Sequence, residues 1–350
     1  MDLYKKIALK IILYLFLTEG MMAQDFHFSQ YQMAPLYVNP ALTGYLQGYN
    51  NRIAIKYRNQ WSSFLQDDAY QTKLVSYDGR ICLGRSFLGY GLNAVLDESG
   101  TPSFRTTQLS GSISYHLPMG KTTYFSAGLQ AGNLQYSVDQ KSLFFEEQFD
   151  GVFSFDPSSS NEENFDDFNS NLLDIGGGIL LYDTKKGWHI GLGMHHTSIK
   201  PRFNFTTNNT QDLNKVNIRA VVHGAYPVPS SSKIQFIPRG LAMIQWPHWQ
   251  AVVGADFKMS LTNKSDFFPY FTIGTALRSS SNKPNSSLVA DAVLLSIATG
   301  FSNNFTFGFS YDLNISSLNA VSGFRGGMEF SLMYQFTVKE KNACVYCPSF

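Results

Sequence analysis

The sequence predicts an all-β protein, a closed antiparallel transmembrane barrel of about fourteen strands. Three observations predict it: stretches of alternating apolar and polar residues, an N-terminal export signal, and connections whose lengths alternate along the chain. The alternating stretches fill residues 51–338. Because side chains in a strand point to opposite faces with a period of two, each stretch has one apolar and one polar face.

Residues 1–23 have the pattern of a secretory signal peptide. Lys5, Lys6 and Lys10 precede an apolar run, residues 11–17, and Ala23 is a candidate last residue before cleavage. A membrane anchor is the alternative, but the run is well short of the roughly 20 residues that span a bilayer. The exported chain is then a soluble sandwich or a closed barrel, since only helices and closed barrels satisfy their backbone in lipid.

Composition favours the barrel. Aromatic and charged residues each make up 15% of the chain, and the charged share is below the roughly 25% usual for soluble domains. A lipid-facing belt needs aromatic rings and excludes charge. The net charge of +1 argues against a nucleic-acid partner, which would require a strongly basic face.

The number of strands and the lengths of their connections distinguish a barrel from a sandwich. Connections after even-numbered strands are short, and most of those after odd-numbered strands are longer, including residues 137–171 and 199–213. An even strand count with long loops at one end is the layout of bacterial barrels. The expected strands are 51–58, 69–78, 86–97, 103–117, 121–136, 172–183, 187–198, 214–228, 232–245, 249–260, 267–279, 287–300, 303–313 and 325–338.

The last strand shows the clearest two-faced pattern. Met328, Phe330 and the apolar residues that alternate with them should face lipid, with Glu329 and Gln335 in the lumen. We expect this strand to pair with the first strand, near residues 53–57, and so to close the barrel.

Several segments resemble a known family. Residues 24–44, QDFHFSQYQMAPLYVNPALTG, followed by YRNQW at 57–61, resemble the opening of the PorP/SprF family of Bacteroidetes outer-membrane proteins tied to the type IX secretion system. Residues 76–78, 128–132, 311–314 and 326–332 resemble later family landmarks in the same order. The residues that carry the N-terminal resemblance are Phe28, Ser29, Gln30, Pro35, Asn39, Pro40, Gly44, Tyr57, Arg58, Gln60 and Trp61.

This resemblance implies a function that periodicity does not supply. It implies a non-enzymatic barrel in the outer membrane of a Gram-negative bacterium, which supports secretion or surface anchoring of a partner protein such as a gliding adhesin. Its partners would be the lipid bilayer, a secreted substrate or surface adhesin, and periplasmic or outer-membrane secretion components. The alternative from the fold alone is a porin or solute transporter of fourteen-strand size.

Residues 24–50 form an irregular segment ahead of the barrel, residues 51–338. Pro35, Pro40 and Gly44 exclude a central strand or a long helix, yet the segment is rich in aromatic and aliphatic side chains. The lumen of a fourteen-strand barrel is wide enough for a plug, so we expect this segment in the lumen or its periplasmic mouth. A disordered leader is the alternative.

The segment 139–168 is strongly acidic and interleaved with phenylalanine, which suggests a partner-docking loop or a divalent-cation site. Solvated surface charge is the plain alternative. The residues expected to dock a partner are Glu146, Glu147, Asp150, Glu162, Glu163, Asp166 and Asp167.

Catalytic and metal signals are weak. His189, His195 and His196 lie close in sequence, but His196 should point away from the other two, so a shared site would need a bulge. No catalytic residue, cofactor or metal ligand is predicted. Gly176–Gly178, with Gly191 and Gly193, predict a strand bend or the packing of a neighbouring ring.

The three cysteines are expected on the periplasmic side. Cys82 should lie in the turn after the second strand, and Cys344 and Cys347 lie in the tail, residues 339–350. An exported location permits a disulfide between Cys82 and a tail cysteine, or between the two tail cysteines. Free thiols are the alternative.

Overall fold

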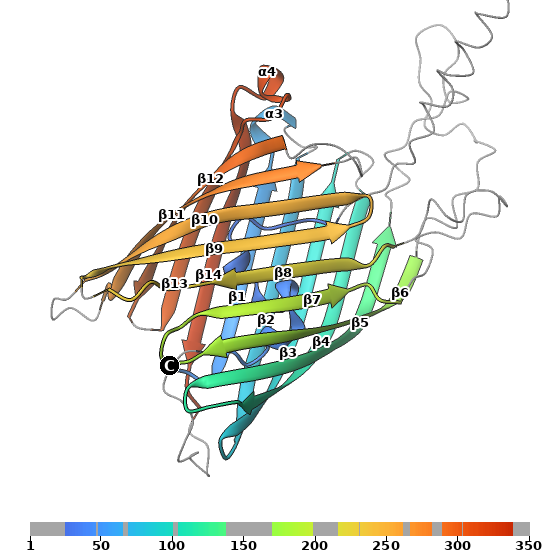
Figure 1. Cartoon of the computed structure of the whole chain (residues 1–350). Helices are drawn as coiled ribbons and strands as arrows, with labels where there is room; N and C mark the ends of the chain where they lie inside the picture. The colour runs from blue at the N-terminus through green and yellow to red at the C-terminus, as the bar shows by residue number, and fades with distance from the viewer. Residues whose placement is uncertain are drawn as a thin grey trace, which may run out of the picture.

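A computed structural model describes residues 25–46, 48–65, 69–100, 104–137, 170–198, 216–230, 232–261, 267–281, 289–302 and 304–338. Within these residues, fourteen strands form a closed antiparallel barrel, and each strand pairs with its neighbours in the chain (Figure 1). The predicted fold class is confirmed. No helix in the described part of the chain is long and apolar enough to cross a bilayer.

The strands follow the alternating stretches closely. Three short helical turns precede them, η1 (Tyr31–Met33), α2 (Pro35–Val38) and η2 (Pro40–Leu42), and two more lie in connections, α3 (Ser62–Leu65) and α4 (Asn319–Ser322). The strands are β1 (Asn51–Gln60), β2 (Tyr70–Leu83), β3 (Ser86–Ser99), β4 (Phe104–Pro118), β5 (Thr123–Ser137), β6 (Ser170–Asp183), β7 (His189–His195), β8 (Arg219–Ala225), β9 (Ile234–Gln245), β10 (His248–Ser260), β11 (Tyr270–Ser281), β12 (Val289–Phe301), β13 (Phe305–Asn314) and β14 (Arg325–Phe336).

The barrel closes as the last strand predicts. Tyr57 pairs with Phe330 in the register between β1 and β14. The side chain of Phe330 is 50% exposed on the outer face, whereas Glu329, one residue earlier, is 0% exposed. The two faces of β14 therefore separate as expected, with apolar groups outside and polar groups in the lumen.

Three strand ends differ from the expectation. Cys82 lies inside β2, not in the turn after it, because pairing continues to Leu83 and leaves only a tight turn before β3. β7 ends at His195 because His196 adopts a positive φ of 57°, which takes the chain out of the ladder. β8 ends at Ala225, because Tyr226 donates to the backbone oxygen of Pro238 at 3.0 Å but Pro238 has no N–H to return the bond.

The connections divide the barrel into two ends. The end that carries residues 138–169 and 196–218 we term the long-loop end, and the opposite end we term the short-turn end. The division by loop length has exceptions. At the long-loop end, only two residues, Trp246 and Pro247, join β9 to β10. At the short-turn end, residues 226–233 and 261–269 exceed a tight turn.

Candidate functional site

Residues 25–46, which we term the lumen segment, lie inside the barrel (Figure 1). Its helical turns are short, and α2 and η2 each begin with a proline, which fits the first turn of a helix but not the interior. Asn39 caps η2 by accepting a hydrogen bond from the backbone N–H of Ala41 at 2.9 Å. Every residue from Phe28 to Gly44 except Gln32 is buried. Such burial requires that the barrel wall satisfy the segment's backbone.

The carboxylate of Glu329, on β14, is a central acceptor for this segment. It is fully buried and accepts hydrogen bonds from the backbone N–H groups of Ser29 and Gln30, the second at 3.0 Å. Lys56 Nζ lies 3.1 Å from the same carboxylate and donates to the backbone oxygen of Gln30 at 2.7 Å. Because a buried charge is tolerated only when it is paired and hydrogen-bonded, this contact joins the segment to β1 and β14.

Arg58 extends the contact to a second carboxylate. One of its terminal nitrogens bonds Glu329, and the other lies 2.9 Å from Asp312 on β13. Asp312 also accepts hydrogen bonds from Ser29 Oγ at 2.6 Å and from Arg278 Nη1, on β11, at 2.9 Å. We term this network the charged wall: Lys56, Arg58, Arg278, Asp312 and Glu329.

The beginning of the lumen segment is held at the long-loop end. Asp25 contacts His196 Nε2 at 2.6 Å and Arg219 Nη1 at 3.1 Å. Burial alone would raise the pKa of the Asp25 carboxyl, but the charges of His196 and Arg219 hold it well below its ordinary value. His196 also faces Asp174 at 3.0 Å, and although burial opposes its charge, the two carboxylates raise its pKa to about 9. His196 is therefore an imidazolium at neutral pH.

On the opposite side, β5 and β6 meet the segment with glycines at inward positions. A Cβ added to Gly128 would lie 2.4 Å from the carbonyl carbon of Pro40, and one added to Gly178 would lie 2.0 Å from Asn39 Oδ1. No side chain fits in this gap, so the segment packs directly on the strands' backbone. Several inward glycines make such approaches, and we term the following four the glycine wall: Gly89, Gly128, Gly178 and Gly193. Of the glycines expected to bend a strand or to pack against a neighbouring ring, Gly191 lies against the ring of His223, whereas Gly178 and Gly193 lie against the lumen segment.

The other end of the segment is fixed near the short-turn end. The backbone N–H of Gly44 donates to Asp78 Oδ2 at 2.8 Å, and Arg52 holds both oxygens of the same carboxylate at 2.8 Å. Gly44 has a φ of +73°, which glycine adopts without strain. Thr43 presents its backbone oxygen to Ser114 Oγ at 2.6 Å. The segment is thus bonded to the wall at both ends.

The predicted motif residues do not form one site. Arg58 and Gln60 point into the lumen, where Gln60 accepts a hydrogen bond from Arg58 at 3.1 Å. Tyr57 lies on the outer face of β1, and Trp61 follows β1 and packs edge-on against Tyr70. The others lie in the lumen segment: Phe28, Ser29, Gln30, Pro35, Asn39, Pro40 and Gly44.

Sequence reasoning missed most of the barrel groups that hold the segment. It placed Glu329 in the lumen but gave no role to Lys56, Asp312, Arg278 or Arg219. The period-two pattern places these side chains on the lumen face, but the interior of a barrel is ordinarily polar, so the pattern does not indicate which of them meet the segment.

The expectation that His196 points away from His195 is wrong. The positive φ at His196 turns its side chain back into the lumen, and both imidazoles are buried with ring centroids 6.4 Å apart. His189 lies at the other end of β7, where its ring approaches His223. Within the described ranges, no group of three or more His, Cys, Asp or Glu side chains is arranged to hold a metal ion.

Several predicted residues lie outside the described part of the chain. These are the signal segment 1–23, the acidic loop residues Glu146, Glu147, Asp150, Glu162, Glu163, Asp166 and Asp167, and the tail with Cys344 and Cys347. Cys82 is disulfide-bonded. Its pairing with a tail cysteine stays a prediction.

Residues 21–334 match the family described as type IX secretion system membrane protein PorP/SprF. The chain belongs to this family. Together with the barrel, this membership makes the chain an outer-membrane protein, and the family description names a secretion system and no enzymatic activity. No curated protein matches the chain.

This chain is only distantly similar to solved outer-membrane barrels. The CymD monoaromatic hydrocarbon channel has 12% identity and a TM-score of 0.47, with 92% of this chain and 97% of that chain covered. The P. putida toluene transporter TodX has 10% identity and a TM-score of 0.46, with coverage of 86% and 93%. A bacterial polysaccharide outer membrane secretin has 8% identity and a TM-score of 0.40, with coverage of 83% and 99%.

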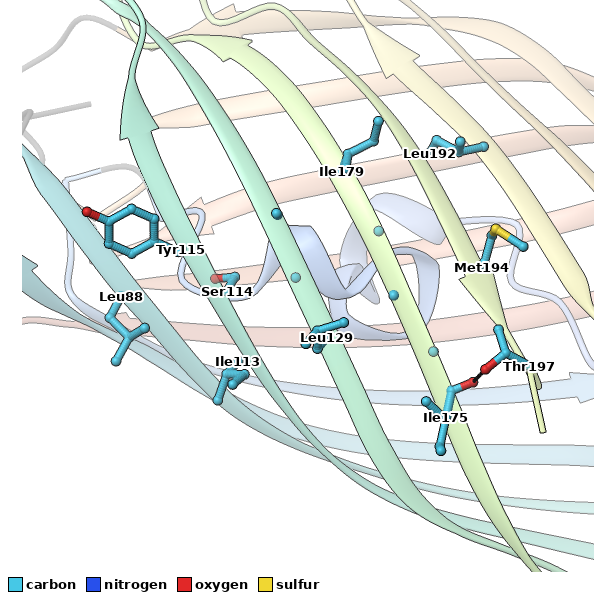
Figure 2. Close-up of a pocket in the computed structure, with 15 residues that line it drawn as sticks. Leu88, Ile113, Ser114, Tyr115, Leu129, Ile175, Ile179, Leu192, Met194 and Thr197 are labelled. Carbon is cyan, nitrogen blue, oxygen red and sulfur yellow. Dashed lines mark hydrogen bonds between the residues drawn. The ribbon is translucent and has the colours of Figure 1, made fainter.

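A separate hollow of about 710 Å³ lies on the outer face of the strands that carry the glycine wall (Figure 2). Figure 2 shows Ile113, Leu129 and Ile179 around it, with the lumen segment behind the strands. Leu129 is 64% exposed on this face. In an outer-membrane barrel this face meets lipid, so the hollow belongs to the membrane surface and not to the lumen site.

Proposed function

We propose that this barrel supports the secretion or surface anchoring of a partner protein by the type IX secretion system, and that the lumen segment is a plug. The partner would be a secreted substrate or a surface adhesin. Family membership supports the secretion role, and the bonds between the lumen segment and the charged wall support the plug. Burying charges costs free energy unless they are paired, and an open pore has no need of a segment bonded to buried charges in its lumen.

Deleting residues 25–46 and recording from single channels in planar bilayers tests the plug. The wild-type protein should be electrically silent, and the deletion should open a conductance, because the inner wall is polar and would fill with water. Glu98→Gln, on the outer face of β3, serves as the matched control and should stay silent. A wild-type protein that conducts like an open porin would contradict the plug and favour a solute channel.

Deletion of the gene tests the secretion role in cells. The set of proteins in the medium and on the cell surface should lose one secreted partner, and the wild-type barrel should copurify with that partner from native membranes. An unchanged set of secreted and surface proteins would contradict the secretion role, whatever the conductance of the barrel.

A further inference from the structure

A cavity of about 280 Å³ lies in the lumen, between the lumen segment and the long-loop end. Asp25, Phe26 and His27 form its floor, and inward residues near the long-loop ends of β1 to β5 form its wall. We term it the lumen cup. The charged and glycine walls explain how the segment is held, but they leave this space unexplained.

The strand register sets the wall of the cup in a row. Thr72 pairs with Asp97, Asp97 with Thr106, and Thr106 with Tyr136. Neighbouring strands lie about 4.8 Å apart, so the backbones of Asp97 and Tyr136 lie roughly 10 Å apart and both side chains line the cup. Phe104 lies beside that ring, with the two centroids 6.0 Å apart. The cup thus combines a carboxylate with two aromatic rings.

Asp97 has no basic partner among the described residues. The hydrogen bond that it accepts comes from Thr72 Oγ1 at 2.6 Å. The other carboxylate of the cup, Asp25, is bonded to both His196 and Arg219. Asp97 is half-buried, and since carboxylates removed from water are normally paired, it is the group of the cup that a cationic ligand would complete.

The positive groups of the cup do not neutralise Asp97. Arg58 is bonded to both carboxylates of the charged wall. His196, the other cation that lines the cup, is bonded to Asp25 and Asp174. Burial and the nearby charges of Arg278 and Arg58 hold the pKa of His27 well below its ordinary value, so its ring is neutral at pH 7. The floor therefore adds no cation that faces Asp97.

Gln108 supplies a second acceptor. Its Nε2 donates to Asp174 Oδ2 at 2.9 Å. Because an ionised carboxylate only accepts, the amide nitrogen must face Asp174, and this leaves Oε1 for the cup. Gln108 is 3% exposed and lines the cup, and among the described residues its side-chain hydrogen bond is the one from Nε2 to Asp174.

We propose that the lumen cup binds the guanidinium group of an arginine side chain presented by the secreted partner. A guanidinium carries five donors, has no acceptor and stacks on aromatic rings. Asp97 and Gln108 supply acceptors only, and Phe104 and Tyr136 supply the rings. The volume lies just below the roughly 300–1,000 Å³ of small-molecule sites, so it admits a side chain and not a domain. The inference rests on the proposed function for its partner.

Peptide binding to the purified full-length protein in detergent tests the cup. The probe is a fluorescently labelled pentapeptide, Gly-Gly-Arg-Gly-Gly, with both ends blocked, followed by anisotropy up to millimolar concentration. We expect saturable binding that Asp97→Asn weakens about tenfold or more, the scale of one charge-assisted hydrogen bond. Tyr136→Leu should also weaken it. Glu98→Gln, next to Asp97 but on the outer face, should bind like the wild type.

Besides a failure of the arginine peptide to bind, three outcomes would overturn the proposal. They are equal binding of the peptide with glutamate in place of arginine, wild-type binding by a folded Asp97→Asn variant, and equal binding of the lysine peptide, which would remove the preference for guanidinium. Circular dichroism checks that each variant keeps its β-sheet. If the peptide does not bind while the partner still reaches the surface, only the arginine site in the cup is overturned. If deletion of the gene leaves the set of secreted proteins unchanged, the proposed function is overturned.

Discussion

The charged wall and the glycine wall hold the same segment by opposite means. On β1 and β14, ionised side chains reach inward and bond to the backbone of Ser29 and Gln30. Those on β11 and β13 bond to one another and to the side chains of His27 and Ser29. On β3, β5, β6 and β7, the wall has no side chain at its glycines, so the segment touches the strands directly, with its backbone and with the side chain of Asn39. The first wall holds the segment through directional hydrogen bonds and charge, and the second holds it through complementary shape.

This difference teaches which substitutions each wall can tolerate. Removing a charge from the charged wall leaves its partners buried and unpaired, so that wall is sensitive to loss. A methyl group added to the glycine wall has no free space to enter, so that wall is sensitive to added side-chain volume. Each wall should therefore fail under a change that the other tolerates better.

The largest expected effect is at Glu329. Glu329→Gln keeps the volume but leaves Lys56 and Arg58 short of a counter-charge, and we expect a loss of roughly 3–5 kcal/mol in the free energy of unfolding. Urea titration in detergent, followed by tryptophan fluorescence, measures it. Glu98→Gln breaks an exposed pair with Lys73 and Arg105, and should cost less than about 1 kcal/mol. Equal losses in the two variants would contradict the charged wall.

The next effect is at Gly128. Gly128→Ala puts a methyl group 2.4 Å from the backbone of Pro40, and we expect a loss of about 1–3 kcal/mol with faster protease cleavage within residues 25–46. Gly111→Ala is the matched control, since its Cβ would lie 3.7 Å from Leu92 on the outer face. If both variants cleave at the wild-type rate, the glycine wall does not hold the segment.

A smaller effect should follow pH at Asp25 and His196. The folded pKa of His196, about 9, exceeds its ordinary value of 6.5, so its contribution to stability is complete below pH 6.5 and is lost as the pH rises through 9. The lowered pKa of Asp25 makes its contribution complete above its ordinary value of 3.8. Hydrogen exchange of residues 25–46 should therefore speed up between pH 6.5 and 9, after correction for the intrinsic rate. His196→Gln should flatten this change, and an unaltered slope would argue against the pair.

The smallest effect is expected at Tyr57. This residue belongs to the family motif but lies on the outer face of β1 and not in the lumen. Tyr57→Phe removes a hydroxyl that lies 3.3 Å from Gln71 Oε1, on the outer face. We expect a change within about 1 kcal/mol and no change in cleavage of the lumen segment. Faster cleavage would show that the motif residues act as one unit across the strand.

The sequence allowed the barrel to be predicted in detail because a strand's faces repeat every two residues. The fourteen strands, the closure of β1 on β14 and the inward position of Glu329 follow from that period. Strand ends were predicted less well, because one backbone dihedral decides where a strand ends. Cys82 and His196 are the examples: pairing keeps the first in its strand, and a positive φ turns the second inward.

The sequence by itself determined which residues of each strand face the lumen and that the chain before β1 could not be a regular strand. Only the tertiary structure decided which inward groups meet. Ser29 and Glu329 are far apart in the chain, and so are Asn39 and Gly178. Local periodicity contains no information about contacts across a closed lumen, because these depend on where the segment lies once all fourteen strands have joined.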